Sequence, residues 1–385
     1  MTMQKYDVII IGAGPAGSTC ALNLAPRGGR ILLLDKHAFP RNKACGGGFT
    51  QKARNLFDFD LSGVIETEVT SVELSLQSRQ PVVVDYPQGA GFMVTREKFD
   101  TLLVERAAAA GAEVRERAPM RGLFPEKNGW RVQTDKDTYY ADFVVGADGP
   151  VSRTARCLGL MQGFHRYAPA LTAEIEPPPD VLDKRKSRVV FDFHVVPKGY
   201  AWIFPKQDHF SVGVFSTCMP QKGLNAALTA FINGQAYLRG RPVRYWKGGL
   251  IPRGGTRQRL VSGNALLVGD AAALTDPFFG EGIYYAARSG MLAAEAIGRA
   301  AAPGGPALEH YQTLCQREIS DDLWWARLFN FGFYRFPFVF YPAVRNSSYL
   351  QKVVIEVNSG RFTWKKSVYR VFQSLPRWLA QMVLP

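Results

Sequence analysis

Residues 6–17 read Tyr-Asp-Val-Ile-Ile-Ile-Gly-Ala-Gly-Pro-Ala-Gly. The β-branched run is typical of a buried parallel strand, and the residues after it predict a helix. Between the two, the Gly-x-Gly-x-x-Gly spacing permits a tight turn, close approach of backbone to a pyrophosphate, and a phosphate at the helix N-terminus. The stretch therefore predicts a Rossmann-type dinucleotide-binding domain, with Gly12, Gly14, Ala16 and Gly17 at the cofactor.

The second predicted strand, residues 30–35, ends in an acidic residue. Asp35 follows Gly12 by 23 residues (35 − 12), where a carboxylate can accept hydrogen bonds from both hydroxyls of an adenosine ribose. We expect Lys36 beside it to border the same cofactor. Arg96 begins another predicted helix, from which its guanidinium can reach the cofactor phosphates.

Later segments favour FAD over NAD. One buried strand ends in Asp270, and Gly280, Gly282 and Ile283 then open a helix. An acid at a strand tip before a glycine-opened helix can bind a ribityl chain and the edge of a flavin. A further buried strand ends near Asp148, which we expect to border the cofactor in the same way. A second site of this kind is hard to explain without a long cofactor.

The middle of the chain has a different pattern. Apolar and polar residues alternate in short runs at 172–176, 188–195 and 210–215, as in antiparallel strands. The expected fold class is α/β, a Rossmann-type FAD-binding domain with an inserted antiparallel-sheet substrate domain and a helical C-terminal region. The expected ranges are 1–165 and 255–302 for a discontinuous FAD-binding domain (with 66–95 assignable to the substrate side), 166–254 for the substrate domain, and 303–385 for the C-terminal region.

Five scattered cysteines, without a Cys-x-x-Cys pair, fit a reducing compartment and exclude a disulfide framework or a four-cysteine cluster. No metal site is predicted. No stretch of 18 uncharged apolar residues exists, so we expect a cytoplasmic protein. The net charge of +14 is concentrated in residues 323–385, which carry nine basic residues and one acidic residue (9 − 1 = +8). No nucleic-acid-binding motif accompanies this charge.

Taken together, these motifs resemble the flavoprotein group that includes para-hydroxybenzoate hydroxylase. Within that group, residues 5–300 look most like the geranylgeranyl reductase family. Aromatic hydroxylases usually carry a histidine shortly after their Gly-Asp motif, and Ala273 stands at that position here. The glycine-opened helix, Gly-Glu-Gly-Ile-Tyr-Tyr-Ala-Ala-Arg-Ser-Gly at 280–290, is similar to that of the reductases.

Residues 43–47, Lys-Ala-Cys-Gly-Gly, are similar to the lysine, cysteine and double-glycine signature of the reductases. The resemblance implies that Ala44, Cys45 and Gly46 lie beside the flavin and that Cys45 is catalytic. A cysteine is most often a small buried apolar residue. Between a lysine and two glycines, however, a thiol lies in an electropositive loop where it can be activated.

Residues 200–205, Tyr-Ala-Trp-Ile-Phe-Pro, are also similar to the reductases. The resemblance implies that Tyr200, Trp202 and Phe204 line a substrate pocket, although alternating aromatics are also what strands bury. Flavin halogenases have a related Trp-x-Trp-x-x-Pro motif. Here its first position is Tyr200, and no lysine in the segment can be placed as a halide-oxidant relay.

The resemblance implies reduction of isolated C=C bonds in a polyprenyl chain, with NADPH or a reduced electron carrier, which can be a protein, as donor. The substrate would be a hydrophobic small molecule, and Cys45 would donate a proton or control access. One alternative is a monooxygenase or halogenase of an aromatic small molecule. Another is an electron-transfer flavoprotein to membrane quinone, although five cysteines cannot build the iron–sulfur domain that such proteins often carry.

The C-terminal region combines basic and aromatic residues. Ten aromatics occur between 324 and 341. Val368, Val371, Phe372 and Leu375 repeat at helical spacing, and residues 376–383 predict a second short helix. Such a region suits peripheral binding to the anionic inner face of a membrane. A packed cap on the substrate domain is the alternative.

Overall fold

The computed structural model describes residues 4–383, except for the side chains of Gln221 and of residues 374–383. The chain forms two compact units, each of which draws on three separate segments. The first unit comprises 1–42, 96–166 and 252–324, and the second comprises 43–95, 167–251 and 325–385.

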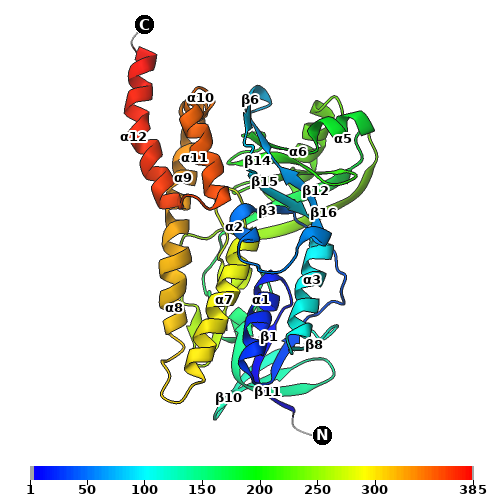
Figure 1. The fold of residues 1–385 in the computed structure, drawn as a ribbon, viewed down its shortest axis with the longest axis vertical. Helices are drawn as coiled ribbons and strands as arrows, with labels where there is room; N and C mark the ends of the chain where they lie inside the picture. Colours follow the sequence, from blue (N-terminus) through cyan, green and yellow to red (C-terminus); the bar gives the residue numbers. More distant parts are fainter. Residues whose placement is uncertain (1–3, 384–385) are drawn as a thin grey trace. The chain divides into compact units, whose positions relative to one another are not determined.

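A parallel sheet forms the centre of the first unit, with β1 in the middle (Figure 1). β1 pairs with β2 on one side and with β11 on the other, and the sheet continues to β8 and β18, every pair parallel. β17 at one edge and the β9–β10 hairpin are antiparallel additions. The bounds are β1 Gln4–Ile11, β2 Ile31–Leu34, β8 Glu113–Arg115, β9 Gly122–Glu126, β10 Gly129–Gln133, β11 Thr138–Gly146, β17 Val261–Ser262 and β18 Ala265–Leu267. The predicted parallel sheet is confirmed.

Helix α1 (Pro15–Leu24) packs against α3 (Arg96–Ala109) and α7 (Ile283–Ala300) in this unit. α1 and α7 lie side by side in Figure 1 because glycine permits close approach. A Cβ at Gly290 would lie 2.3 Å from the Ala16 carbonyl oxygen, and one at Gly269 would lie 2.9 Å from the Ala16 Cβ. Ala16 is therefore buried by helix packing. The short helices are α4 Arg153–Cys157 and α8 His310–Cys315.

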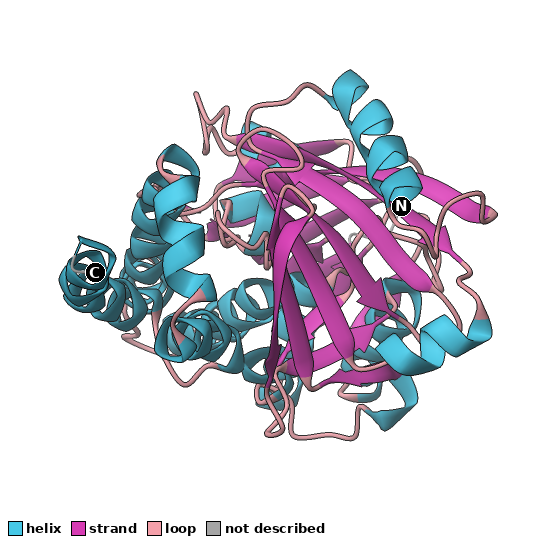
Figure 2. Cartoon of the chain, turned by 90° about the horizontal axis from the view of Figure 1, so that it is seen from above, coloured by secondary structure: helices cyan, strands magenta, loops and turns pink. Residues whose placement is uncertain are grey.

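A seven-stranded sheet dominates the second unit, in the order β16-β12-β15-β14-β13-β5-β6; strands are magenta in Figure 2. Strands 12 to 15 pair antiparallel as expected, but β13 and β5 pair parallel. β5 comes from a distant segment, so no hairpin turn forces the antiparallel direction. The bounds are β5 Ser71–Leu76, β6 Arg79–Asp85, β12 Tyr167–Ile175, β13 Arg188–Phe193, β14 Gly199–Pro205, β15 Phe210–Ser216 and β16 Val243–Pro252.

The two faces of this sheet differ because side chains alternate along each strand. One face is aliphatic and packs against α6 (Gln221–Gly234), with Leu224 and Leu228 fully buried. The opposite face, which we call the aromatic face, carries rings from β13, β14 and β15. Its rings are Phe191, Phe193, Tyr200, Trp202, Phe204 and Phe215, with neighbouring centroids 5.3–6.4 Å apart.

A small sheet accompanies the large one, in the order β3-β7-β4. Its strands are β3 Gly48–Thr50, β4 Ile65–Val69 and β7 Gly91–Val94, and a short helix α2, Gln51–Arg54, follows β3. The Gly47 carbonyl accepts a hydrogen bond from the Val94 N–H at 2.9 Å, which ties the loop before β3 to the end of β7. The loop containing Cys45 is thereby anchored to this sheet.

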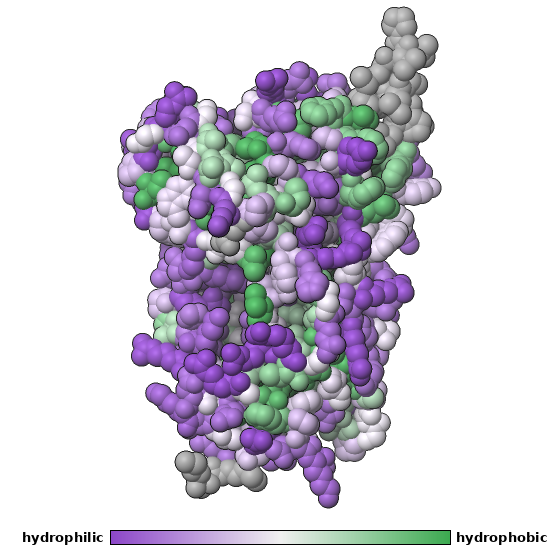
Figure 3. Space-filling view, turned by 180° about the vertical axis from the view of Figure 1, so that it is seen from behind, coloured by the Kyte–Doolittle hydropathy of each residue, from purple (hydrophilic) through white to green (hydrophobic). Residues whose placement is uncertain are grey.

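The C-terminal helices divide their aromatic residues between interior and surface. Tyr341 is buried, and its hydroxyl lies within hydrogen-bonding distance of the carbonyl oxygens of Leu74 (2.9 Å) and Gln80 (2.7 Å), which share its one proton. Phe331 and Phe338, by contrast, are 69% and 67% exposed. Figure 3 shows hydrophobic residues (green) among the hydrophilic ones on one face of the molecule. The bounds are α9 Asp321–Arg335, α10 Pro337–Arg345, α11 Ser348–Ser359 and α12 Trp364–Val383; α5 is Pro179–Arg185.

α12 is one helix where two were expected. Val368 and Val371 are buried, whereas Phe372 is 55% exposed, so the expected apolar stripe packs in part against the protein. Leu375 and the apolar side chains expected beyond it lie outside the described residues. Within the described part of the chain, no helix combines the length and apolar character needed to cross a bilayer.

The compact units differ from the expected ranges in two places. Residues 43–95 group with the seven-stranded sheet, because β5 and β6 complete its edge. The region 303–385 does not form a body of its own. Residues 303–324 group with the first unit, and residues 325–385 pack on the second. The amino-acid composition changes near residue 302, but the contacts that each segment makes decide which compact unit it belongs to.

Candidate active site

The glycine-rich turn after β1 is shaped by close backbone contacts. Gly12 has φ +107°, and a Cβ there would lie 2.3 Å from the Ala147 carbonyl oxygen. A Cβ at Gly17 would lie 1.9 Å from the Gly12 carbonyl oxygen. At Gly14 the only described atom within 4 Å of such a Cβ is Arg41 Nη2, at 3.6 Å. The turn thus has two packed glycines and one open backbone face at the start of α1.

Asp35 follows β2 and is buried, with 7% of the residue exposed. One oxygen accepts the Ala13 N–H at 2.8 Å, and the other accepts the His37 N–H at 2.8 Å. These bonds fix the carboxylate next to the glycine-rich turn. Each oxygen has a second lone pair, so the group can still accept a pair of hydroxyls. Lys36 beside it is exposed.

A buried carboxylate holds two arginines near this turn. Asp100, with no exposed surface, accepts Nε and Nη2 of Arg96 at 2.7 and 2.8 Å and lies 3.0 Å from Nη2 of Arg41. Two guanidinium groups on one carboxylate leave a net positive charge. The Arg41 Nε is buried and has no hydrogen-bond partner among the described residues. The arrangement offers charge and an unused donor near Gly14, as a pyrophosphate requires.

The two other predicted acidic residues have different surroundings. Asp148 caps α4, because one of its oxygens accepts the N–H groups of Arg153 (2.8 Å) and Thr154 (2.9 Å). These hydrogen bonds explain the presence of an acidic residue here by helix capping alone. Asp270 accepts the Thr275 hydroxyl at 2.9 Å and is partly exposed. A Cβ at Gly282 would lie 3.5 Å from the Asp270 carboxylate. Gly280 has φ +70°, and Ile283 begins α7 and is buried.

In the second unit, the Cys45 loop lies directly on the aromatic strand β14. The Gly47 N–H donates to Cys45 Sγ at 3.3 Å. A Cβ at Gly46 would lie 2.9 Å from the Phe204 ring and 3.0 Å from Trp202 Nε1. Trp202 is 6% exposed, and its Nε1 has no hydrogen-bond partner among the described residues. The two segments that the family resemblance singles out are therefore in contact.

Lys206 continues the alternation of β14 onto the aromatic face, although it was not predicted from the sequence. It is 2% exposed, and its Nζ donates to the Val94 carbonyl at 2.8 Å. A Cβ at Gly47, where φ is +77°, would lie 2.2 Å from Nζ. Burial lowers the pKa of Lys206 to about 8, while electrostatic interactions with Cys45, Glu66 and Glu174 oppose that shift. The amine therefore retains most of its charge at neutral pH.

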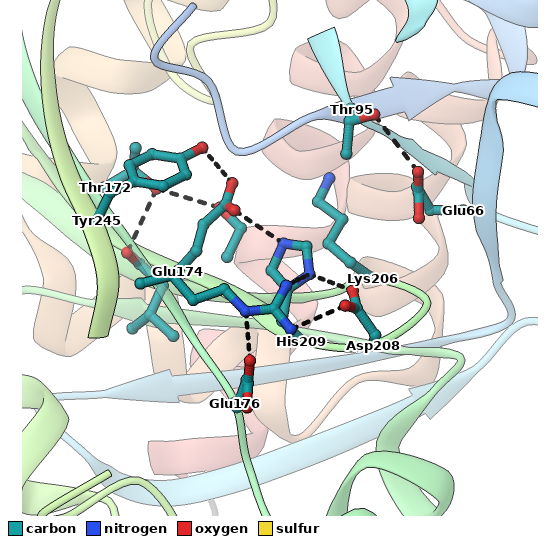
Figure 4. Close-up of polar contacts among 12 residues, drawn as sticks. Glu66, Thr95, Thr172, Glu174, Glu176, Lys206, Asp208, His209 and Tyr245 are labelled. Atoms are coloured by element: carbon teal, nitrogen blue, oxygen red, sulfur yellow. Dashed lines mark hydrogen bonds and ion pairs between the residues drawn. The ribbon is translucent and has the colours of Figure 1, made fainter. Parts of the chain in front are cut away.

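Glu174 on β12 is the centre of a polar network at the same end of the sheet (Figure 4). His209 Nε2 lies 3.1 Å from one of its oxygens, and the Tyr245 hydroxyl donates a short hydrogen bond to the other. Burial raises the pKa of Glu174, but the hydrogen bonds from His209 and Tyr245 outweigh it, so the pKa lies below its ordinary value. Glu174 is therefore an anion at neutral pH.

The network continues from His209 to the surface. Nδ1 lies 2.6 Å from Asp208, which accepts Arg244 Nη2 at 2.8 Å, and Arg244 Nε donates to Glu176 at 2.6 Å. The hydrogen bond from Arg244 is the main reason that the pKa of Asp208 falls to about 2. In Figure 4 Lys206 points away from these residues, toward Thr95 and Glu66. The network thus fixes the turn that carries Lys206 without using its amine.

The amino-acid sequence of the chain matches the FAD binding domain family over residues 5–222, more than half of its length. It is 32% identical to digeranylgeranylglycerophospholipid reductase 1 of Methanopyrus kandleri, over 84% of this chain and 89% of the relative. The chain belongs to the geranylgeranyl reductase family. A second member, the chloroplastic geranylgeranyl diphosphate reductase of Oryza sativa subsp. japonica, is 30% identical over 93% of this chain and 77% of the relative.

Solved structures show the same fold at lower identity. A geranylgeranyl bacteriochlorophyll reductase-like protein of Thermoplasma acidophilum has a TM-score of 0.78 and 24% identity, covering 99% of this chain and all of its own. A flavin-dependent brominase has a TM-score of 0.74 and 20% identity, covering 97% and 100%. The geranylgeranyl reductase family therefore shares its fold with halogenases, and the fold does not distinguish the reactions.

Two residues at these sites escaped the sequence analysis. Arg41 lies in a charged stretch before the cysteine loop, where no spacing rule marks it. Lys206 could have been found, because it follows Tyr200, Trp202 and Phe204 at the same interval of two. Each unit brings its own set together: the glycine turn, Asp35 and Arg96 in the first, and Cys45 with the aromatic strand in the second.

Proposed function

We propose that the protein is an FAD-dependent reductase of isolated C=C bonds in a polyprenyl substrate. The observation that carries this proposal is the contact between the Cys45 loop and the aromatic face. Gly46 and Gly47 have no room for side chains, because the loop that carries the Cys45 thiol packs against Trp202, Phe204 and Lys206. Aromatic rings present apolar surface that suits an unsaturated hydrocarbon chain, which has no polar group to bind. The names of the relatives support the same substrate class.

FAD binding is assigned to the first unit. We propose that Asp35 binds the adenosine ribose, while the Gly14 backbone, Arg41 and the N-terminus of α1 face the pyrophosphate. Asp270, with Gly280 and Gly282 before α7, is proposed to bind the ribityl end. When bound and reduced, FAD supplies hydride to an alkene carbon. NADPH or a small reduced carrier is the proposed source of those electrons.

The chain's own contribution to the chemistry is a proton. An isolated alkene offers no oxygen to polarise, so the second carbon must be protonated by a positioned acid. We propose that the Cys45 thiol is that acid. Tyr200, Trp202 and Phe204 hold the chain and exclude water around the reacting carbons. Positioning therefore provides most of the catalysis, and the thiol completes it.

The test uses anaerobically reduced holoprotein with a geranylgeranyl lipid and with geranylgeranyl diphosphate. We expect products heavier by two hydrogens for each reduced bond, detected by mass spectrometry. Cys45→Ala should retain FAD and lose most of the reduction, or change how many bonds are reduced. Substrate-dependent oxygen consumption without saturated product would instead support a monooxygenase or halogenase. If Cys45→Ala turns over substrate as fast as the wild type does, Cys45 has a packing role only.

Membrane binding is a separate proposal, carried by the C-terminal helices. Phe331, Phe336 and Phe338 are more than half exposed, and Lys365 and Lys366 of α12 are exposed as well. Exposed aromatics next to basic side chains suit the headgroup region of an anionic bilayer. We propose that this region docks the protein peripherally on the inner face of a membrane, from which a lipid-borne polyprenyl chain can enter.

A further inference from the structure

Lys206 is a buried cation with one direct hydrogen bond and no role in the sequence-based prediction. Its Nζ donates to the Val94 carbonyl, a neutral acceptor, and no described carboxylate forms an ion pair with it within 4 Å. Burying an ammonium group without a bonded anion costs free energy, so the presence of Lys206 here calls for an explanation. The reason lies in what its charge faces.

The groups around the Lys206 amine come from four segments. Cys45 lies in the loop before β3, Glu66 on β4 and Glu174 on β12, and the Val94 carbonyl ends β7. The two carboxylates have partners of their own, because Thr95 donates to Glu66 at 3.4 Å and His209 and Tyr245 engage Glu174. On its own turn, Asp208 pairs with His209 and Arg244.

Of the three acidic groups around this amine, Cys45 has the largest influence on the pKa of Lys206. Gly47 connects the two: its N–H donates to Cys45 Sγ at 3.3 Å, and Lys206 Nζ occupies the space that a Gly47 side chain would need. A second, independent feature points to the same place. The buried Trp202 Nε1 faces Gly46 with no hydrogen-bond partner among the described residues, so β14 presents an unused donor to the loop that carries the thiol.

We propose that Lys206 is a positioning residue for Cys45, whose ammonium charge stabilises the Cys45 thiolate and returns a proton to it. The catalytic consequence rests on the proposed function. After the thiol has given its proton to the alkene, the sulfur is an anion. The Lys206 N–H bond then breaks, an S–H bond forms, and the neutral amine regains its proton from water. No electrons move in this step.

The acidity of Cys45 can be measured without turnover. Cys157→Ser and Cys218→Ser remove the two exposed thiols, and Cys20 and Cys315 are buried. The rate of iodoacetamide alkylation of Cys45, read by peptide mass spectrometry against pH, then reports its thiolate fraction. In this background Lys206→Met removes both charge and hydrogen bond. Lys206→Gln keeps a donor for the Val94 carbonyl and removes only the charge.

We expect both variants to raise the alkylation midpoint by about one pH unit or more, which lowers the thiolate fraction roughly tenfold at neutral pH. Lys198→Met is the matched control. It removes the same charge from an exposed position before β14, roughly 25 Å away along the strand. Its midpoint should equal that of the background.

Two outcomes overturn the proposal. An unchanged midpoint in both Lys206 variants, with normal FAD content, shows that the charge does not act on Cys45. If Lys206→Met raises the alkylation midpoint and Lys206→Gln does not, the Lys206 side chain has a packing role only. If Lys206→Met unfolds, Lys206→Gln alone decides the question. Failure of polyprenyl reduction in the wild type would refute the proposed function and leave the alkylation result standing.

Discussion

Gly46 lies against Trp202 so closely that a Cβ on the glycine would be 3.0 Å from the indole Nε1. The contact is possible because the indole itself occupies the place of a side chain on the adjacent strand. A Cβ at Gly213, opposite Trp202 on β15, would lie 2.1 Å from its ring. Two glycines, one on each side, thus make room for the ring.

This packing predicts that Gly46→Ala displaces the Cys45 loop. The added methyl would meet the Phe204 ring at 2.9 Å, and such overpacking costs about 1–3 kcal/mol. We expect a lower melting temperature and at least a tenfold loss of alkene reduction. Gly48→Ala is the control, because its Cβ would meet Phe204 at an ordinary 3.7 Å. Equal melting temperatures and equal activities of the two variants would contradict the close contact between Gly46 and β14.

The position of Asp35 predicts that its removal weakens FAD binding. Asp35→Ala removes the carboxylate that accepts the Ala13 N–H and, by our proposal, the ribose hydroxyls. Hydrogen bonds to charged groups contribute about 1.5–3 kcal/mol each, so FAD affinity should fall at least tenfold. The ratio of flavin absorbance to protein after gel filtration measures it. Asp142→Asn, which loses only an ion pair with Lys5 on the adjacent strand, should keep its FAD.

The pKa of Lys206 predicts how stability changes with pH. Burial holds that pKa at about 8, whereas an unfolded lysine titrates near about 10.4. Between these values the unfolded chain binds more protons than the folded chain, so stability rises as the pH increases from about 8 toward 10. The gain is roughly 1.4 kcal/mol for each unit of pKa difference.

Urea unfolding from pH 7 to 10 measures this rise, and Lys206→Met should lack it. Because other groups titrate in the same range, the quantity to compare is the difference between wild type and variant at each pH. A difference that stays constant over the whole range would show that Lys206 titrates normally. The alkylation experiment would then have to explain Cys45 without a shifted lysine.

The C-terminal helices predict salt-sensitive membrane binding. Each basic residue near an anionic surface contributes about 1 kcal/mol, and the screening length is roughly 8 Å at physiological ionic strength. Binding to vesicles should therefore increase with acidic lipid and decrease with salt. Neutralising Lys365, Lys366 and Arg370 should release the protein from vesicles while FAD content is retained.

The matched control neutralises three basic side chains of the first unit, Lys127, Lys136 and Arg156, which are exposed. This variant has the same net charge and should bind vesicles as the wild type does. If both triple variants lose binding equally, net charge alone explains the attraction. If the wild type ignores acidic vesicles at low salt, the C-terminal region is a packed cap.

The sequence by itself determined the nucleotide-binding half of this protein. Strand, glycine turn, helix and acid lie within residues 6–35, so their relationship is local, and the parallel sheet follows from the repeated strand–helix pattern. The glycines at 12 and 17 are required by contacts within that unit, which is why a spacing rule identifies them. The family resemblance also named both segments of the second site.

Only the tertiary structure decided how those two segments meet. Cys45 and Trp202 are 157 residues apart (202 − 45), and no periodicity relates them. The contact between the Cys45 loop and Trp202 depends on the packing of the loop against β14 and on glycines that leave space for rings. The alternation of β14 places Lys206 on the aromatic face, but only the tertiary structure shows that its amine is buried. A lysine after a strand is usually solvated, and its charge becomes consequential only when neighbouring strands remove it from water.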